Sequence, residues 1–144
     1  MNTTLYEQDF YAWANQQASL LRAGRLTDAD IANIAEEIES MGRSEKRELV
    51  NRLAVLLLLL LKWQFQPGLR GNSWRLSVEE QRYRLESHLR DNPSLKAILD
   101  TATHEAYRLA LIEAERDTGL ARRTFPAECP YGFEQAMRAD FWPE

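Results

Sequence analysis

The sequence is poor in residues that build covalent or metal-bound frameworks. Its 144 residues contain one cysteine, Cys129, and two histidines, His88 and His104. A single cysteine forms no intramolecular disulfide, and Cys129 has no second cysteine or histidine at a ligand spacing. The two histidines fall on different expected helices without a spacing motif. A disulfide scaffold and a zinc finger are therefore excluded, and we expect no cofactor.

Signatures of catalysis, export and membrane insertion are also missing. No serine-hydrolase, P-loop or dinucleotide-binding motif occurs. The N-terminal residues lack the basic and apolar regions of a secretory signal. The longest apolar run, residues 53–61, is too short to cross a hydrocarbon core of about 30 Å. We expect a cytoplasmic protein with no membrane partner, and an enzyme is the less favoured hypothesis.

Strand signals are absent too. No stretch alternates with a period of two residues, and β-branched residues are few. With five prolines and six glycines the chain has no linker of biased composition. The sequence therefore predicts an all-α fold in a single domain, residues 1–144. About five helices form a bundle over residues 1–118, and an irregular C-terminal tail, residues 119–144, wraps over it.

Capping residues and glycines predict where the helices begin and end. The expected helix starts are Thr4, Thr27, Ser44, Ser73 or Ser77, and Asn92 followed by Pro93. The expected ends include Gly24, Gly42 and Gly119. Apolar residues at helical spacing in the first two helices predict core-facing stripes. These stripes comprise Tyr6, Phe10, Trp13, Ala14, Leu20 and Leu21, and Ile31, Ile34, Ala35, Ile38 and Met41.

The most apolar stretch is the run of leucines that ends at Trp63, and we expect it to be the central helix. One helical face is occupied by Leu49, Leu53, Leu56, Leu57 and Leu60. The opposite arc begins as polar and then continues as Val55, Leu58 and Leu59. Either the chain's own helices surround this arc, or Val55, Leu58 and Leu59 meet a second subunit in a homodimer.

Motifs along almost the whole chain resemble one bacterial family, the domain of unknown function twenty-nine. They are LYEQDFYAW at 5–13, LLRAGR at 20–25, AEEIESMG at 35–42, LLKWQFQP at 60–67, NPSL at 92–95, and FPAECP and FWP near the end. The resemblance implies an all-helical domain without an established activity. Its shared motifs include Glu36, Glu37, Glu39, Lys62 and Trp63. The family pattern carries a histidine where this chain has Leu59, so a chemical site built on that histidine would lack one group here.

Three carboxylates suggest one chemical alternative. Glu36 and Glu39 are one turn apart and could share a divalent cation, with Glu37 beside them, in a metal-carboxylate enzyme. Carboxylates on one helix are more often a solvated face with basic partners such as Arg43 or Lys62.

The basic middle of the chain suggests another alternative. Residues 62–90 carry six basic and three acidic groups, and aromatic residues lie among them. Arg70, Arg75, Arg82 and Arg84 could contact nucleic-acid phosphates. However, Trp63 and Trp74 occupy core-facing positions, which leaves little aromatic surface for bases. The favoured hypothesis is therefore a non-catalytic helical module that binds another protein or itself.

Overall fold

The computed structural model describes residues 3–144, and their side chains from Leu5 onward. Within this range all regular structure is helical, which confirms the all-α prediction. The helices are α1 (Thr3–Gln8), α2 (Phe10–Arg22), α3 (Ile31–Phe65), η1 (Pro67–Leu69), α4 (Asn72–Asp91), η2 (Pro93–Ile98), α5 (Leu99–Thr118), η3 (Arg122–Thr124) and α6 (Phe133–Met137). The side chain of Thr4 lies outside the described residues, so its capping role stays a prediction.

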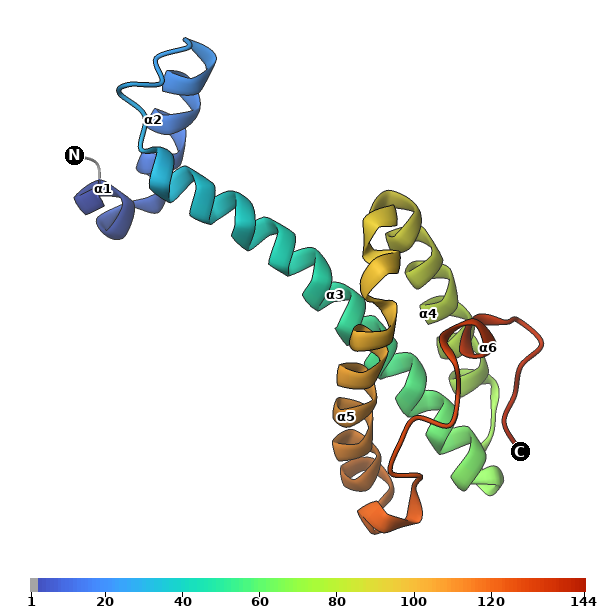
Figure 1. Cartoon of the computed structure of the whole chain (residues 1–144). Helices are drawn as coiled ribbons and strands as arrows, with labels where there is room; N and C mark the ends of the chain where they lie inside the picture. Colours follow the sequence, from blue (N-terminus) through green and yellow to red (C-terminus); the bar gives the residue numbers. More distant parts are fainter. Residues whose placement is uncertain (1–2) are drawn as a thin grey trace. The chain divides into compact units, whose positions relative to one another are not determined.

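Contacts divide the chain into two compact units. Unit 1 comprises residues 1–44 and unit 2 comprises residues 45–144, and α3 contributes to both. Figure 1 shows the order of the elements along the chain. The number of domains stays a prediction.

The expected first helix is interrupted at Asp9. The structure has two helices there, α1 and α2, and Asp9 between them has a non-helical backbone (φ −149°, ψ 84°). Its Oδ1 accepts a hydrogen bond from the backbone N of Ala12 at 3.0 Å. Asp side chains compete for backbone donors in this way, which makes them N-caps rather than interior residues. The predicted end is confirmed: Gly24 has φ +73°, a conformation that suits glycine.

Helix α3 begins later than predicted and has a different cap. Asp30, not Thr27, precedes it, and Asp30 Oδ1 accepts from the backbone N of Asn33 at 3.4 Å. Residues 25–29 form a turn instead. The cap predicted at Thr27 is thus replaced by the carboxylate of Asp30, a residue type that caps helices more strongly than threonine.

The predicted break at Gly42 and restart at Ser44 are wrong. Helix α3 runs through both residues for 35 residues in all. Gly42 has no positive φ, so it does not act as a left-handed terminator. A glycine inside a helix costs only about 1 kcal/mol relative to alanine, and the flanking Arg, Lys and Glu residues are good helix formers. The boundary between the two units follows Ser44 directly, so this sequence signal marks a unit boundary within the helix rather than a helix end.

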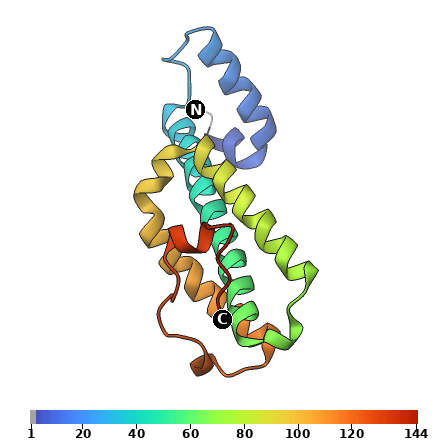
Figure 2. The same ribbon diagram turned by 90° about the vertical axis from the view of Figure 1, so that its right-hand side faces the viewer.

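The core of unit 2 forms around the leucine run. Leu49, Leu53, Leu56, Leu57 and Leu60 are all buried, as the periodicity predicted. Figure 2 shows α4 and α5 running beside the unit 2 part of α3, with the red C-terminal segment crossing these helices. Small residues of α5 (Ala102, Ala106, Ala110 and Ala114) are buried in the same cluster, which allows close helix approach.

Two helix starts in unit 2 differ from prediction in detail. Helix α4 begins at Asn72 after Gly71, rather than at Ser73 or Ser77. The segment after Asn92 is 3₁₀ helix up to Ile98, and α5 begins only at Leu99. A 3₁₀ turn is common at a helix N-terminus, so Pro93 still initiates helical structure. Helix α5 ends at Thr118, and Gly119 has φ +74°, both as predicted.

The tail packs on unit 2 through buried anchors. Phe125 and Tyr131 are buried, and Tyr131 Oη donates to Gln64 Oε1 at 2.5 Å. Tyr107 Oη of α5 donates to the carbonyl oxygen of Pro126 at 2.6 Å. The tail also contains the short helix α6, Phe133–Met137. Buried aromatic side chains and two hydrogen bonds, to Gln64 of α3 and from Tyr107 of α5, thus hold the tail on unit 2.

Among the described residues, no helix is both long and apolar enough to span a membrane.

Candidate functional site

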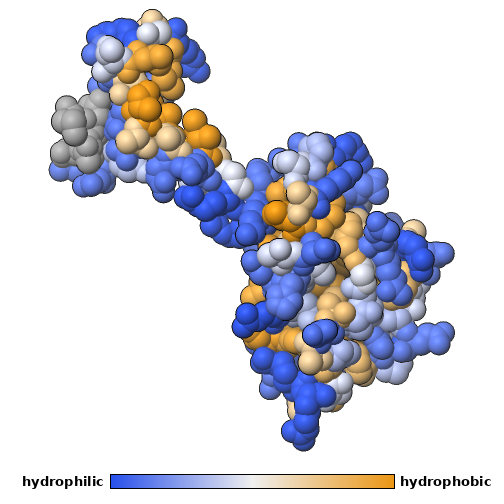
Figure 3. All heavy atoms as spheres, in the orientation of Figure 1, coloured by the Kyte–Doolittle hydropathy of each residue, from blue (hydrophilic) through white to orange (hydrophobic). Residues whose placement is uncertain are grey.

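Unit 1 carries an open apolar groove between α2 and the first part of α3. Its volume is about 430 Å³. We call it the apolar groove, and it is lined by Phe10, Trp13, Ala14, Gln17, Ala18, Leu21, Ile34, Glu37, Ile38 and Met41. Figure 3 shows the hydrophobic side chains of unit 1 gathered along α2 and the start of α3.

The residues of this groove were predicted to be core, and several are not. Phe10 is 50% exposed, Ile38 59% and Met41 62%, and Leu21 and Ile31 are exposed as well. Only Trp13 and Gln17 are buried in α2, and no residue of α3 before Leu49 is. The physical reason is that packing of α2 on α3 buries one face of each helix, and the remaining element of unit 1, the short helix α1, leaves these side chains exposed.

Polar contacts beneath the groove hold the two helices together. Trp13 Nε1 donates to Asp30 Oδ2 at 3.1 Å, and the backbone N of Asp30 donates to Gln17 Oε1 at 2.7 Å. The side-chain hydrogen bond from Asn33, with a smaller contribution from that of Trp13, keeps the pKa of Asp30 below its ordinary value. The Nε2 of Gln17 has no hydrogen-bond partner among the described residues.

The three carboxylates of α3 have separate roles. Glu37 accepts a hydrogen bond from Tyr6 Oη, which raises the pKa of Tyr6 to about 12. Glu36 forms an exposed ion pair with Arg43 at 3.4 Å, and Glu39 is exposed. Glu36 therefore fits the interpretation of these carboxylates as an exposed face with basic partners. Glu37 instead borders the apolar groove.

Lys62 and Trp63 have structural partners in unit 2. Lys62 Nζ lies 3.4 Å from Asp117 Oδ2 and 5.3 Å from the centre of the Trp74 ring. Trp63 packs against Trp142 with ring centres 4.4 Å apart. These contacts give both residues a structural role in the packing of the helices and the tail of unit 2.

The arginines suggested as nucleic-acid contacts also have partners within the protein. Arg82 is only 7% exposed and donates to carbonyl oxygens of the tail, and burial lowers its pKa. Arg70 Nε donates to the carbonyl oxygen of Trp63 at 2.7 Å. Arg75 bonds Asn72, and Arg84 pairs with Glu80 at 2.8 Å. Arg75 and Arg84 are exposed, whereas Arg82 has no surface left for a phosphate.

The three residues suggested as a subunit interface differ in their exposure to solvent. Leu58 and Leu59 are each 8% exposed, because the chain's own helices cover them, whereas Val55 is 37% exposed. Unit 2 therefore offers one apolar side chain at this place rather than a continuous surface. The apolar groove of unit 1 presents far more uncovered apolar area.

A polar cluster that sequence spacing did not reveal lies in unit 2. Glu45 and Glu48 of α3 and His88 of α4 each offer a ligand atom within 4.8 Å of the others. His88 Nε2 is 2.9 Å from the carbonyl oxygen of Glu45, and Nδ1 is 3.5 Å from Glu48 Oε2. The hydrogen bond from Arg52 holds the pKa of Glu48 below its ordinary value, so this carboxylate is ionised at neutral pH. Glu45 and Glu48 at i, i+3 were the available sequence signal, but only the packing of α4 on α3 supplies the histidine.

The fold and the groove define a class: an all-helical protein with an uncovered apolar groove in one unit and a tail-wrapped leucine core in the other. Within this class the chain belongs to the family described as domain of unknown function DUF29, which matches residues 5–142. The resemblance found in the sequence motifs is thereby confirmed. No curated protein and no solved structure matches the chain.

Proposed function

We propose that this protein is a helical interaction module that binds a second copy of itself through the apolar groove of unit 1. The observation that carries the proposal is the exposure of Phe10, Ile38 and Met41 on a unit whose α2 buries only Trp13 and Gln17. A cytoplasmic location, expected from the sequence, remains part of this proposal.

The size of unit 1 supports the need for a partner. A segment of about 40 residues rarely buries enough surface to be stable without a disulfide, a metal or association. Unit 1 contains no cysteine. Covering the groove removes large apolar side chains from water, at about 25 cal/mol for each Å² of apolar surface.

Its geometry favours a second copy. Two helices with one apolar face are half of a four-helix bundle, and two such pairs complete it. A twofold interface requires a self-complementary surface, and a groove lined by similar apolar residues on both helices satisfies this condition.

The test is the oligomeric state of the full chain. Light scattering after gel filtration, over micromolar to submillimolar concentrations, should give the mass of two chains. Ile38→Glu places a charge in the groove without disturbing a buried residue and should shift the protein to monomer. Leu76→Glu is the matched control, because Leu76 is similarly exposed (52%) but lies on α4, and it should leave the dimer intact.

A wild-type protein that stays monomeric across this range would refute the self-association. So would a dimer that Ile38→Glu leaves unchanged, because the interface would then lie elsewhere.

A further inference from the structure

A second concave site lies in unit 2, between the C-terminal part of α4, η2 and α6. Its volume is about 450 Å³, which is within the range of small-molecule sites. We call it the tail pocket, and it is lined by Glu86, Leu89, Arg90, Lys96, Phe133, Glu134, Met137 and Arg138. Sites of this size that bind small molecules combine an apolar lining with a few polar groups, and the tail pocket has both.

The apolar part of the tail pocket comes from two helices. Leu89 of α4 is 6% exposed, and Phe133 and Met137 of α6 are half-buried against the same core. Phe133 and Met137 are four residues apart, so they lie on one face of α6. Methionine is flexible and polarisable, which lets it adapt to the shape of an apolar ligand. The pocket thus offers an apolar surface to a chain of methylene groups.

The charged residues of the tail pocket leave one lysine without a carboxylate partner. The lining has three basic and two acidic residues, a net charge of +1. Arg90 pairs with Glu86 at 3.3 Å. Arg138 lies one turn after Glu134 on α6, and it also lies 3.6 Å from the exposed Asp140 outside the lining. Lys96 is exposed and forms no ion pair among the described residues, so its charge is available to a ligand.

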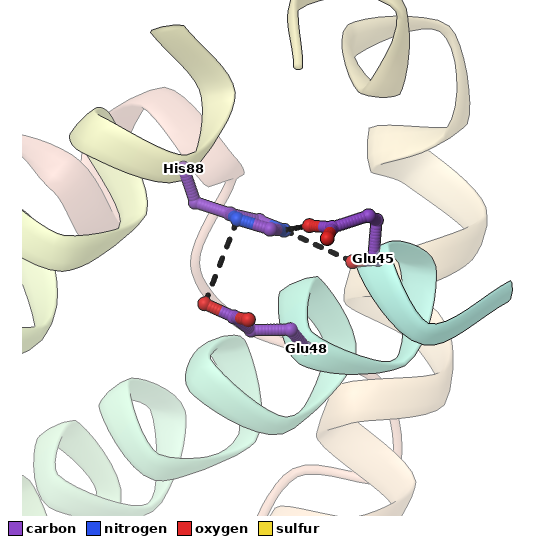
Figure 4. Close-up of side chains that lie close together, drawn as sticks. All are labelled: Glu45, Glu48 and His88. Atoms are coloured by element: carbon purple, nitrogen blue, oxygen red, sulfur yellow. Dashed lines mark hydrogen bonds and ion pairs between the residues drawn. The ribbon is translucent and has the colours of Figure 1, made fainter. Parts of the chain in front are cut away.

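Both walls of the tail pocket are held in place by contacts of the protein itself. On the tail side, the buried Arg82 donates to the carbonyl oxygen of Ala136 in α6 at 2.8 Å. On the α4 side, the ring of His88 lies between Glu45 and Glu48 of α3, as Figure 4 shows. Its Nε2 is 2.9 Å from the carbonyl oxygen of Glu45. A preformed pocket loses little conformational freedom on binding, which favours affinity.

We propose that the tail pocket binds a small aliphatic monocarboxylate, with the carboxylate at Lys96 and the alkyl chain on the three apolar side chains. A monoanion matches the single free positive charge of the lining. A phosphate dianion fits less well, because both arginines of the lining already face carboxylates. The alkyl chain supplies the binding free energy, since its methylene groups leave water for an apolar surface.

The test is a titration of sodium octanoate into the full chain, followed by nuclear magnetic resonance of isotope-labelled methionine methyl groups. Met137 lines the tail pocket and Met41 lines the apolar groove of unit 1, so the two signals distinguish the sites. The expected result is a saturable shift of the Met137 signal while the Met41 signal stays in place. A shift of Met41 without one of Met137 would assign octanoate to the apolar groove and overturn the proposal. A Met137 signal that does not move would overturn it as well.

A series of ligands separates the contribution of the chain from that of the charge. Burial of one methylene group strengthens binding by up to about fourfold, so octanoate should bind about four- to sixteenfold tighter than hexanoate, which is two methylene groups shorter. Octan-1-ol, which has the chain without the charge, should bind more weakly than octanoate. Equal affinities for hexanoate and octanoate would refute the apolar contact, and equal affinities for octanol and octanoate would refute the contact with Lys96.

Three substitutions of exposed residues locate the carboxylate. Lys96→Gln should weaken octanoate binding by about fivefold, the upper range for a partly exposed ion pair. Glu134→Gln removes a negative charge from the lining and should strengthen binding. Lys46→Gln is the matched control, because Lys46 is an exposed lysine of α3 that lies 4.0 Å from Glu105 and outside the pocket. It changes the net charge equally and should bind octanoate as the wild type does.

Two results with these variants would contradict the placement of the ligand. Unchanged affinity in Lys96→Gln would show that the carboxylate does not lie at this lysine. Equal weakening in Lys96→Gln and Lys46→Gln would show that affinity follows the net charge of the protein rather than the tail pocket. Circular dichroism checks that each variant is folded.

Discussion

Replacing Arg82 by methionine should detach the C-terminal tail and destabilise unit 2 by about 3 kcal/mol. Arg82 Nε and Nη2 donate to the carbonyl oxygens of Ala136 and Phe141, each at 2.8 Å. A hydrogen bond from a charged group contributes a net 1.5–3 kcal/mol, and the lower value for each of two bonds gives about 3 kcal/mol. A third contact, from Arg82 Nη1 to the carbonyl oxygen of Ala139, is long at 3.5 Å and contributes little.

Methionine is the suitable replacement because it keeps the apolar stem of arginine and removes only the guanidinium. Arg82→Lys tests the geometry rather than the charge. A lysine retains the positive charge but cannot reach carbonyls on both sides with a planar fork, so we expect an intermediate loss of about 2 kcal/mol.

The measurement is urea denaturation followed by circular dichroism and by tryptophan fluorescence, since Trp142 of the tail lies 5.3 Å below the Arg82 guanidinium. Limited proteolysis then reports release of the tail. Arg84→Met is the control, because Arg84 forms an exposed pair with Glu80, and such pairs contribute about 0–1 kcal/mol. If the free energy of unfolding of Arg82→Met lies within about 0.5 kcal/mol of the wild-type value and the tail of the variant resists protease, Arg82 does not hold the tail.

Three further predictions concern the core, a helix end and pH. Leu60→Ala removes a fully buried side chain and should lower the free energy of unfolding, measured by urea denaturation, by about 2–5 kcal/mol. A loss below about 1 kcal/mol would contradict the position of Leu60 in the core. Gly119→Ala should lower the free energy of unfolding by about 1–2 kcal/mol. Backbone strain at φ +74° is the whole reason, because a Cβ there meets no atom within 4 Å, and a variant as stable as the wild type would refute this. Burial raises the pKa of Tyr107 to about 12, so the folded state holds this proton more tightly than the unfolded state does, and stability should be complete below pH 10 and fall between about pH 10 and 12. In alkaline denaturation, Tyr107→Phe should lose less stability between about pH 10 and 12 than the wild type does. An equal loss in the variant would mean that other groups cause it.

Much of the fold was accessible from local patterns. Gly24 and Gly119 end helices as predicted because a left-handed residue is a local property of the chain. The buried positions of the leucine run followed from helical periodicity, since the spacing of Leu53, Leu56, Leu57 and Leu60 alone places them on one face.

Other boundaries were decided by competition that spacing does not reveal. The sequence predicted the cap at Thr27, but the structure has it at Asp30, and hydrogen bonds with Trp13 and Gln17 hold Asp30 in place. Gly42 and Ser44 resemble an end and a start, yet α3 passes through them, since helix formers on either side outweigh a cost of about 1 kcal/mol.

The sequence by itself determined that this protein is helical, where its leucine core lies and to which family it belongs. Only the tertiary structure decided which apolar stripes are covered. Periodicity assigned the stripes of α2, of early α3 and of the leucine run alike to the interior, because an apolar stripe records a need for burial and not what meets it. The leucine run is covered by α4, α5 and the tail, whereas Phe10, Ile38 and Met41 stay at least half exposed. The tertiary structure alone also decided the neighbours of His88. This residue lies 40 residues after Glu48 in the chain and reaches it only because α4 packs on α3.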